Sequence, residues 1–150
     1  YKDVSPFEIS GGQQRRVAVA GILSMNPKVL VLDELTAGLD PIGREEIFRE
    51  LMKIYEADEE LTIVLVSHSM EDVAEYVDRV IVMNEGKVYS DNSTFETFTS
   101  VDLDTIGLDV PQITKFMRAY KKKSPNVDEK IYTVDAAIEE LYKHLGGENG

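Results

Sequence analysis

Three short segments of this chain carry residue types that can act together on a phosphate group. Residues 10–13 read Ser-Gly-Gly-Gln, Asp33 and Glu34 end an apolar run, and His68 follows a second apolar run. Backbone amides at a helix start bind phosphate, carboxylates hold a divalent metal ion and orient water, and a histidine can contact a phosphate oxygen. In combination, these residue types indicate phosphoryl-transfer chemistry on a nucleotide.

The first segment is suited to bind an anion without the help of a cation. Ser10 is placed to cap a helix over residues 11–23, and Gly11 and Gly12 have no Cβ, so a polyphosphate can come close to the backbone. The helix N-terminus adds about half a positive charge. Ser-Gly-Gly alone is more often an ordinary capped helix start, but Gln13 and the later segments favour a phosphate site.

The two adjacent carboxylates can divide the work of such a site. Asp33 and Glu34 follow an apolar run at residues 29–32 that predicts a strand buried on both faces of a parallel sheet. Adjacent residues at the end of a strand point in different directions, so one can hold Mg²⁺ through water while the other polarises the attacking water. Acidic residues at strand ends are common, but ligands of open α/β sheets bind at this edge.

Histidine could report on the state of the phosphate. His68 follows a second predicted strand at residues 63–66, where it could donate to a γ-phosphate oxygen, although a lone histidine is more often a surface or capping residue. The other histidine, His144, lies in the last predicted helix, and we interpret it as structural. Asp40 is predicted to cap a helix that begins at Pro41.

The elements that position these residues alternate between strand and helix, which predicts an α/β fold with right-handed parallel crossovers. The helix over residues 11–23 is expected to bury an apolar face and to leave Arg15 and Arg16 outward. Ser69 is predicted to cap a short helix. Residues 80–83 and 87–89 flank Asn-Glu-Gly and predict a hairpin at the sheet edge.

The pattern changes to helices alone near residue 90. A capping-box spacing begins at Ser93, and amphipathic helices are predicted over residues 109–122 and 133–145, the second ending at Gly146. We therefore expect one domain over residues 1–90 and a helical extension over residues 91–150.

The composition excludes several kinds of site. The 150 residues are 43% hydrophobic and 29% charged, enough for one sizeable core. The net charge of -12 argues against strong binding to nucleic acid. Without cysteine there is neither a disulfide nor a thiol site, which fits a reducing, cytosolic compartment, and no apolar run approaches the roughly 20 residues that span a bilayer. The start at Tyr1, close to a functional motif, suggests a fragment of a longer protein.

Four motifs in order resemble those of the ATP-binding cassette (ABC) ATPases. Residues 9–13 are similar to the signature motif, residues 29–34 to the Walker B strand with its catalytic glutamate, residues 37–40 to the D-loop, and His68 to the switch histidine. The resemblance covers roughly residues 8–90. It implies the distal part of a P-loop NTPase parallel sheet with flanking helices, plus a small, mostly helical C-terminal extension.

Two further segments resemble the ATPases of energy-coupling factor transporters, which import vitamins, cobalt or nickel in prokaryotes. Residues 14–23 are very like their signature helix, and residues 106–112 are similar to a segment of their C-terminal extension. The resemblance implies an ATP-binding, ATP-hydrolysing subunit that uses ATP and Mg²⁺.

The resemblance also implies a role for each site residue. Ser10, Gly11, Gly12 and Gln13 would close on ATP held by a partner subunit, while Asp40 would couple the two sites across the interface. The remaining residues would act on nucleotide bound to their own subunit: Asp33 on Mg²⁺, Glu34 as general base and His68 on the γ-phosphate.

The same family implies partners and a place in the cell. A second ABC ATPase subunit, identical or paralogous, would form a head-to-tail dimer that residues 91–150 strengthen. A transmembrane coupling subunit and a substrate-binding membrane subunit would complete the transporter at the cytoplasmic face of the membrane, without nucleic acid.

Three departures from the family pattern affect the expectation. Leu35 stands where the family usually has proline, and the absence of proline loosens the backbone constraint on Glu34. Ile9 replaces a common leucine, a change of similar volume that should cost little. No Gly-x-x-x-x-Gly-Lys-Ser/Thr loop occurs, and the Gly86-Lys87 pair lacks its flanking residues. The isolated chain is therefore expected to be inactive.

Two other functions remain open from the sequence. The chain could come from a non-transport ABC ATPase of translation or DNA repair, for which a coiled-coil insertion or a tandem cassette in the full-length sequence would be evidence. It could also be an assembly module in which the helices after residue 90 dimerise and the catalytic residues are idle.

Overall fold

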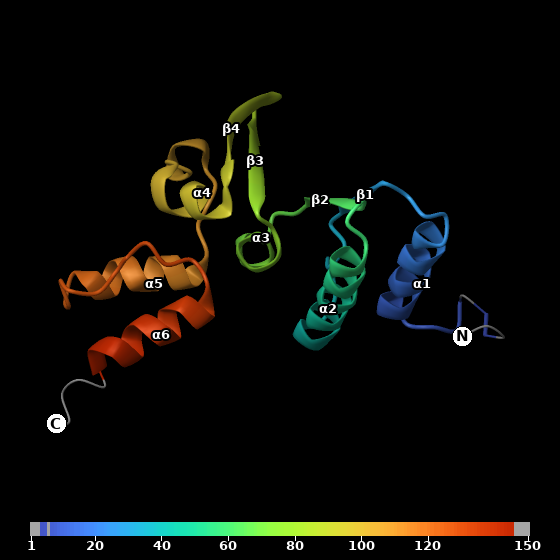
Figure 1. Cartoon of the computed structure of the whole chain (residues 1–150), viewed down its shortest axis with the longest axis horizontal. Coiled ribbons are helices and arrows are strands. Elements are labelled where there is room, and N and C mark those ends of the chain that lie inside the picture. Colours follow the sequence, from blue (N-terminus) through green and yellow to red (C-terminus); the bar gives the residue numbers. More distant parts are fainter. Residues whose placement is uncertain (1–3, 6, 146–150) are drawn as a thin grey trace. The chain divides into compact units, whose positions relative to one another are not determined.

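The structure is a computed structural model that describes residues 4–5 and 7–145 (Figure 1). These residues belong to two units: the first ends at His68 and the second begins at Ser69. The first unit contains helices and a parallel strand pair, and the second contains an antiparallel strand pair and the remaining helices.

The first unit alternates helix and strand as the sequence predicts. Its elements are α1 (Gly11–Leu23), β1 (Val29–Asp33), α2 (Pro41–Ala57) and β2 (Thr62–Val66). Helices α1 and α2 lie side by side (Figure 1), and the Arg16–Glu46 ion pair of 2.9 Å joins them. The α/β class is therefore confirmed for this unit.

Strands β1 and β2 pair in parallel, and their register decides what meets at the carboxyl edge. Asp33 lies opposite Val66, and the backbone N–H of Glu34 donates to the Val66 carbonyl at 2.9 Å. The ladder therefore extends one residue beyond β1. Both strands end at the same edge of the pair, as a parallel arrangement requires.

The prediction that β1 is buried on both faces is wrong for this unit. Leu30 and Leu32 are buried, whereas Val31 is 60% exposed. Helix α2 contributes its own buried side chains, Ile47, Phe48 and Leu51, to this unit, whereas the face of β1 that carries Val29 and Val31 is exposed. The alternation follows from the strand period of two, since successive side chains point to opposite faces.

Helix α1 begins where predicted but buries less than predicted. None of its side chains is buried, and Val17 is 49% exposed. A small pocket of about 80 Å³, lined by apolar side chains such as Val19 and Ile47, separates α1 from α2. The predicted apolar face of α1 is therefore only loosely packed.

The second unit begins with a helix and a hairpin. Helix α3 (Met70–Tyr76) is capped by Ser69 as predicted, and β3 (Arg79–Asn84) pairs antiparallel with β4 (Lys87–Ser93). Among the strands that the structure describes, β3 and β4 pair with each other, which confirms the predicted hairpin, and its position at the edge of the parallel sheet stays a prediction. The Arg79 guanidinium forms two hydrogen bonds with the Asp91 carboxylate, of 2.7 and 2.6 Å, and thereby lowers the pKa of Asp91.

Helices make up the rest of the second unit. They are α4 (Thr94–Ser100), the short η1 (Asp104–Ile106), α5 (Gln112–Lys121) and α6 (Val134–Leu145). Ser93 forms the predicted capping box with Glu96 at the start of α4. The division proposed between residues 90 and 91 falls inside β4 and stays a prediction.

One predicted helix begins later in the structure than its sequence pattern indicates. Helix α5 begins at Gln112 rather than residue 109, because Pro111 forms its N-cap and the Asp109 carboxylate is engaged with Lys115. Gly146, the predicted end of the last helix, lies outside the described residues. No helix within residues 4–5 and 7–145 is both long and apolar enough to cross a membrane.

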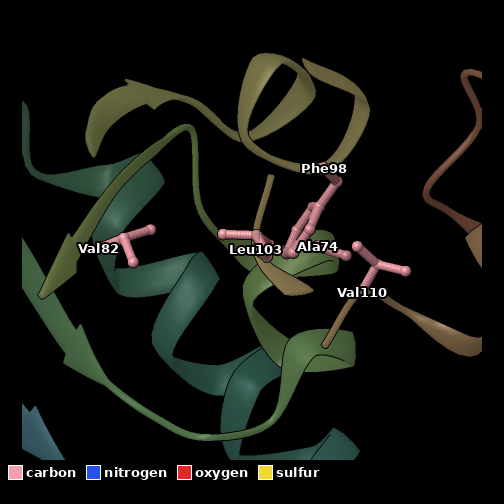
Figure 2. Close-up of a cluster of buried hydrophobic side chains, with 5 residues drawn as sticks. All are labelled: Ala74, Val82, Phe98, Leu103 and Val110. Atoms are coloured by element: carbon pink, nitrogen blue, oxygen red, sulfur yellow. The ribbon is translucent and has the colours of Figure 1, made fainter. Parts of the chain in front are cut away.

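Among the residues that the structure describes, two apolar clusters hold the second unit together. Figure 2 shows the first, in which the side chain of Phe98 in α4 points toward Ala74 and Leu103. Val82 of β3 and Val110, which follows η1, lie to either side. The second cluster joins α5, α6 and the loop between them through Met117, Val127, Ile131 and Ala137.

Replacing Phe98 with alanine should lower the free energy of unfolding by about 3–5 kcal/mol, because Phe98 is 1% exposed and its removal leaves a cavity. Phe95 is the matched control on the same helix: it is 47% exposed and touches Tyr132 edge-on, so Phe95→Ala should cost about 1 kcal/mol. Urea unfolding of both variants measures the difference. Equal losses would show that the cluster in Figure 2 does not carry the stability of this unit.

Candidate functional site

The Ser10 turn, which we define as residues 10–13, is held by a reciprocal cap. The Gln13 backbone N–H donates to Ser10 Oγ at 3.3 Å, and the Ser10 backbone N–H donates to Gln13 Oε1 at 2.9 Å. This capping box fixes the start of α1 and gives Gln13 a structural task beside any role toward a ligand. A Cβ on Gly11 would meet nothing within 4 Å, so Gly11 leaves open space before the helix.

The Glu34 loop, which we define as residues 34–40, consists of two consecutive turns. The Ala37 backbone N–H donates to the Glu34 carbonyl, and the Leu39 N–H donates to the Thr36 carbonyl, both at 3.1 Å. Gly38 has a φ of 74°, a left-handed conformation that glycine adopts without strain. The turns carry the chain from the end of β1 to the start of α2.

Glu34 itself has a left-handed backbone, with a φ of 50°. This conformation costs a non-glycine residue roughly 1–2 kcal/mol, so the surrounding structure must hold it. Leu35, which is 8% exposed, anchors the next position. A proline at position 35 would favour an extended backbone at Glu34, and leucine removes that restriction. The departure from the family pattern at residue 35 thus coincides with an unusual conformation at residue 34.

Glu34 and His68 meet at the carboxyl edge of the parallel pair. His68 Nδ1 lies 2.8 Å from each Glu34 carboxylate oxygen. An ionised carboxylate has no proton to give, so Nδ1 donates and the Nε2 side of the ring stays available. The His68 side chain is 84% exposed and that of Glu34 40% exposed, so both are open to a ligand.

Asp33 is the metal-binding candidate. It ends β1 as an exposed residue and lies opposite Val66 in the register. The described residues contain no group of three or more His, Cys, Asp or Glu side chains that could hold a metal ion by themselves. Mg²⁺ needs no such cage, because it takes one or two carboxylates together with water and substrate phosphates. A single carboxylate at this edge fits that requirement.

Asp40 caps α2 as predicted. Its Oδ1 accepts a hydrogen bond from the Gly43 backbone N–H at 2.7 Å, and Pro41 occupies the first helical position. A Cβ on Gly43 would lie 3.0 Å from Asp40 Oδ1, so glycine permits the short approach. The cap fixes the carboxylate at the end of the Glu34 loop.

The structure separates the predicted site residues into two groups. An open pocket of about 750 Å³ has Ser10, Gly11, Gly12 and Asp40 in its lining. Asp33, Glu34 and His68 are not part of that lining and lie at the carboxyl edge of β1 and β2. The sequence does not show this division, because it depends on how the Glu34 loop folds beside α1.

Two arginines that were expected to point outward belong to the same region. Arg15 and Arg16 are half-buried, and both line the pocket beside the Ser10 turn. Arg15 Nη1 donates to the Leu35 carbonyl at 3.2 Å and also to the Ala37 carbonyl. The prediction was wrong because helical periodicity ranks arginine as a solvent-facing residue and cannot detect backbone carbonyls presented by a distant loop.

His144 has the structural contacts expected of it. Its Nδ1 lies 2.9 Å from the Glu140 carbonyl oxygen, and its Nε2 lies 3.0 Å from the Asn126 carbonyl oxygen. The ring therefore bridges α6 and the loop before it. Neither contact involves the first unit.

Comparison with known proteins points to one family. The family model described as "AAA domain, putative AbiEii toxin, Type IV TA system" matches residues 1–72. The energy-coupling factor transporter ATP-binding protein EcfA2 of Clostridium tetani is 51% identical over 144 residues, which cover 95% of this chain and 50% of the relative. This chain thus spans about half the length of the curated relatives it matches.

Solved structures agree with the sequence comparison. The chain cbiO1 of Clostridium perfringens, part of the ABC transporter complex cbiONQ, superposes with a TM-score of 0.60 and 36% identity over 80% of this chain and 42% of that one. A bacterial ABC transporter cassette solved as a dimer gives a TM-score of 0.52 and 36% identity over 60% of this chain and 38% of that one. The chain therefore belongs to the ABC ATPases and is related to the ATP-binding proteins of energy-coupling factor transporters.

Proposed function

We propose that the protein containing this chain is the ATP-binding and ATP-hydrolysing subunit of an energy-coupling factor importer for vitamins or transition metal ions. The observation that carries the proposal is the contact between Glu34 and His68, of 2.8 Å, at the shared edge of two parallel strands. The names of the related proteins support the transport role over a role in translation or DNA repair.

Each residue at the strand edge has a task in that reaction. ATP with Mg²⁺ supplies the phosphoanhydride bond to be broken and the neutralisation of phosphate charge. Asp33 would hold Mg²⁺ through water. Glu34 accepts a proton from the attacking water, and His68 keeps the Glu34 carboxylate oriented through Nδ1, which leaves the Nε2 side of the ring for the γ-phosphate.

The Ser10 turn works on the other nucleotide of a dimer. Gly11 and Gly12 let phosphates of ATP held by a partner subunit approach the start of α1, and Asp40 lies in the same pocket at the interface. The partner is a second ABC ATPase subunit, and the solved dimer of a related cassette supports this arrangement. Two membrane subunits, one for coupling and one for substrate binding, complete the importer at the cytoplasmic face of the membrane.

The helices after residue 90 strengthen that dimer. Helices α5 and α6 share a buried cluster, yet they expose apolar side chains at Phe116, Ile138 and Tyr142, the last of them 75% exposed. An association through these side chains would remove them from water. This role accompanies hydrolysis and does not replace it.

Glu34→Gln in the full-length protein should reduce kcat for ATP hydrolysis by at least ~100-fold, because the amide cannot accept the proton of the attacking water. Binding of ATP, followed with a fluorescent analogue, should persist. Glu45→Gln on the exposed side of α2 makes the same chemical change away from the site and should leave kcat unaltered. Hydrolysis at the wild-type rate in Glu34→Gln would remove Glu34 from the role of base.

Gly11→Ala should abolish most ATP hydrolysis although the added methyl group meets nothing within 4 Å in its own subunit. The loss would come from a collision with nucleotide presented by the partner. Gly21→Ala lies in the same helix with equally open surroundings, and it should retain activity and gain up to about 1 kcal/mol of stability. ATPase assays and thermal unfolding distinguish the two variants. If Gly11→Ala is as active as Gly21→Ala, then the Ser10 turn does not contact nucleotide.

Tyr142→Glu should weaken dimerisation by placing a charge where an exposed ring would be buried. Glu139→Lys, on an exposed polar position of the same helix, changes the charge without removing apolar surface and should have little effect. Sedimentation velocity over a range of concentrations reports the dimer fraction. An unchanged dimer in Tyr142→Glu would exclude this part of α6 from the interface.

A further inference from the structure

We propose that Arg15 is a positioning residue that ties the Ser10 turn to the Glu34 loop of the same subunit, so that closure on the partner's nucleotide sets the geometry of the subunit's own catalytic glutamate. The inference rests on the proposed function, since it concerns the same hydrolysis reaction. Its basis is the pair of hydrogen bonds from one guanidinium group to two carbonyls of the Glu34 loop.

The carbonyls that Arg15 contacts alternate with those that close the turns. The backbone hydrogen bonds of the loop use the carbonyls of Glu34 and Thr36, and Arg15 takes those of Leu35 and Ala37. One side chain therefore contacts both consecutive turns. Both bonds come from Nη1 of the charged guanidinium, whose N–H groups are held in one plane, and hydrogen bonds from a charged donor are stronger than neutral ones.

This contact falls where the backbone needs support. Glu34 holds a left-handed φ of 50°, and the Leu35 carbonyl bonded to Arg15 belongs to the next residue. Without Arg15 the turn could relax toward a more common conformation and carry the carboxylate away from His68. The 2.8 Å contact between Glu34 and His68 would then lengthen or break.

The Ser10 turn is also close to these contacts. Arg15 lies two residues after Gln13, on the first turns of the helix that the Ser10 turn begins. Gly12 packs against the same loop, since a Cβ there would lie 3.2 Å from Leu39 Cδ2. A displacement of the Ser10 turn is therefore transmitted to the Glu34 loop through Arg15 and Leu39. Two direct contacts, through Arg15 and through Leu39, thus join the Ser10 turn to the Glu34 loop within one subunit.

The test is steady-state ATP hydrolysis by the full-length protein in its dimer. Arg15→Met should lower kcat by ~10- to 100-fold while the KM for ATP changes less than about twofold, because a misplaced base slows chemistry without removing nucleotide contacts. Arg15→Lys keeps the positive charge and the aliphatic part of the side chain but not the planar guanidinium group. Its kcat should lie between those of the wild type and Arg15→Met. If Arg15→Met fails to fold, then Arg15→Lys supplies the measurement.

Two matched variants separate positioning from general effects. Arg49→Met removes an exposed guanidinium from α2 and should leave kcat unaltered. Glu46→Gln breaks the ion pair that joins Arg16 to α2, so it loosens the contact between the helices without touching the Glu34 loop, and kcat should change less than twofold. A fall in kcat for Glu46→Gln as large as that for Arg15→Met would overturn the inference.

Glu34→Gln in the same series separates this inference from the proposed function. An inactive Glu34→Gln together with a wild-type kcat in Arg15→Met would overturn the role of Arg15 and leave the proposed function intact. An active Glu34→Gln would instead refute the assignment of the base. A selective loss of kcat in Arg15→Met, beside inactive Glu34→Gln and unaffected Arg49→Met, supports the connection.

Discussion

The parallel pairing of β1 with β2 is the constraint on which the candidate site depends. Its register sets Asp33 opposite Val66, and the extra hydrogen bond from the Glu34 N–H to the Val66 carbonyl brings the end of one strand beside the chain that leads to His68. Glu34 and His68 are 34 positions apart in sequence, yet only 2.8 Å separates a Glu34 carboxylate oxygen from His68 Nδ1. Helix α2 contributes large buried apolar side chains to the same unit and thereby stabilises it.

The candidate site combines a firmly bonded frame with exposed chemistry. Capping side chains fix the starts of both helices in the first unit, through Ser10 with Gln13 and through Asp40 with Gly43. The side chains proposed to act on nucleotide are themselves exposed or half-buried. Such a division suits a site that is completed by another subunit, because the frame keeps each group in place while the ligand arrives from outside.

The elements were largely predictable, and the burial was not. The N-caps of α1, α2, α3 and α4 all lie at the predicted residues, because a capping side chain bonds to an amide only two or three positions away. Burial depends on what covers a surface. The apolar run at β1 therefore predicts two covered faces, but in this unit only one is covered, and α1 has no buried residue although its pattern is apolar.

The sequence by itself determined the motifs, the family, and the residues that can act on a phosphate, because residue type and short-range spacing encode these features. Only the tertiary structure decided that the predicted site consists of two groups, that Glu34 has a left-handed backbone, and that Arg15 reaches the loop beyond it. Each of these depends on where a folded loop places its carbonyls and side chains. The helical periodicity around Arg15 cannot indicate where a loop about 20 residues later in the chain places its carbonyls.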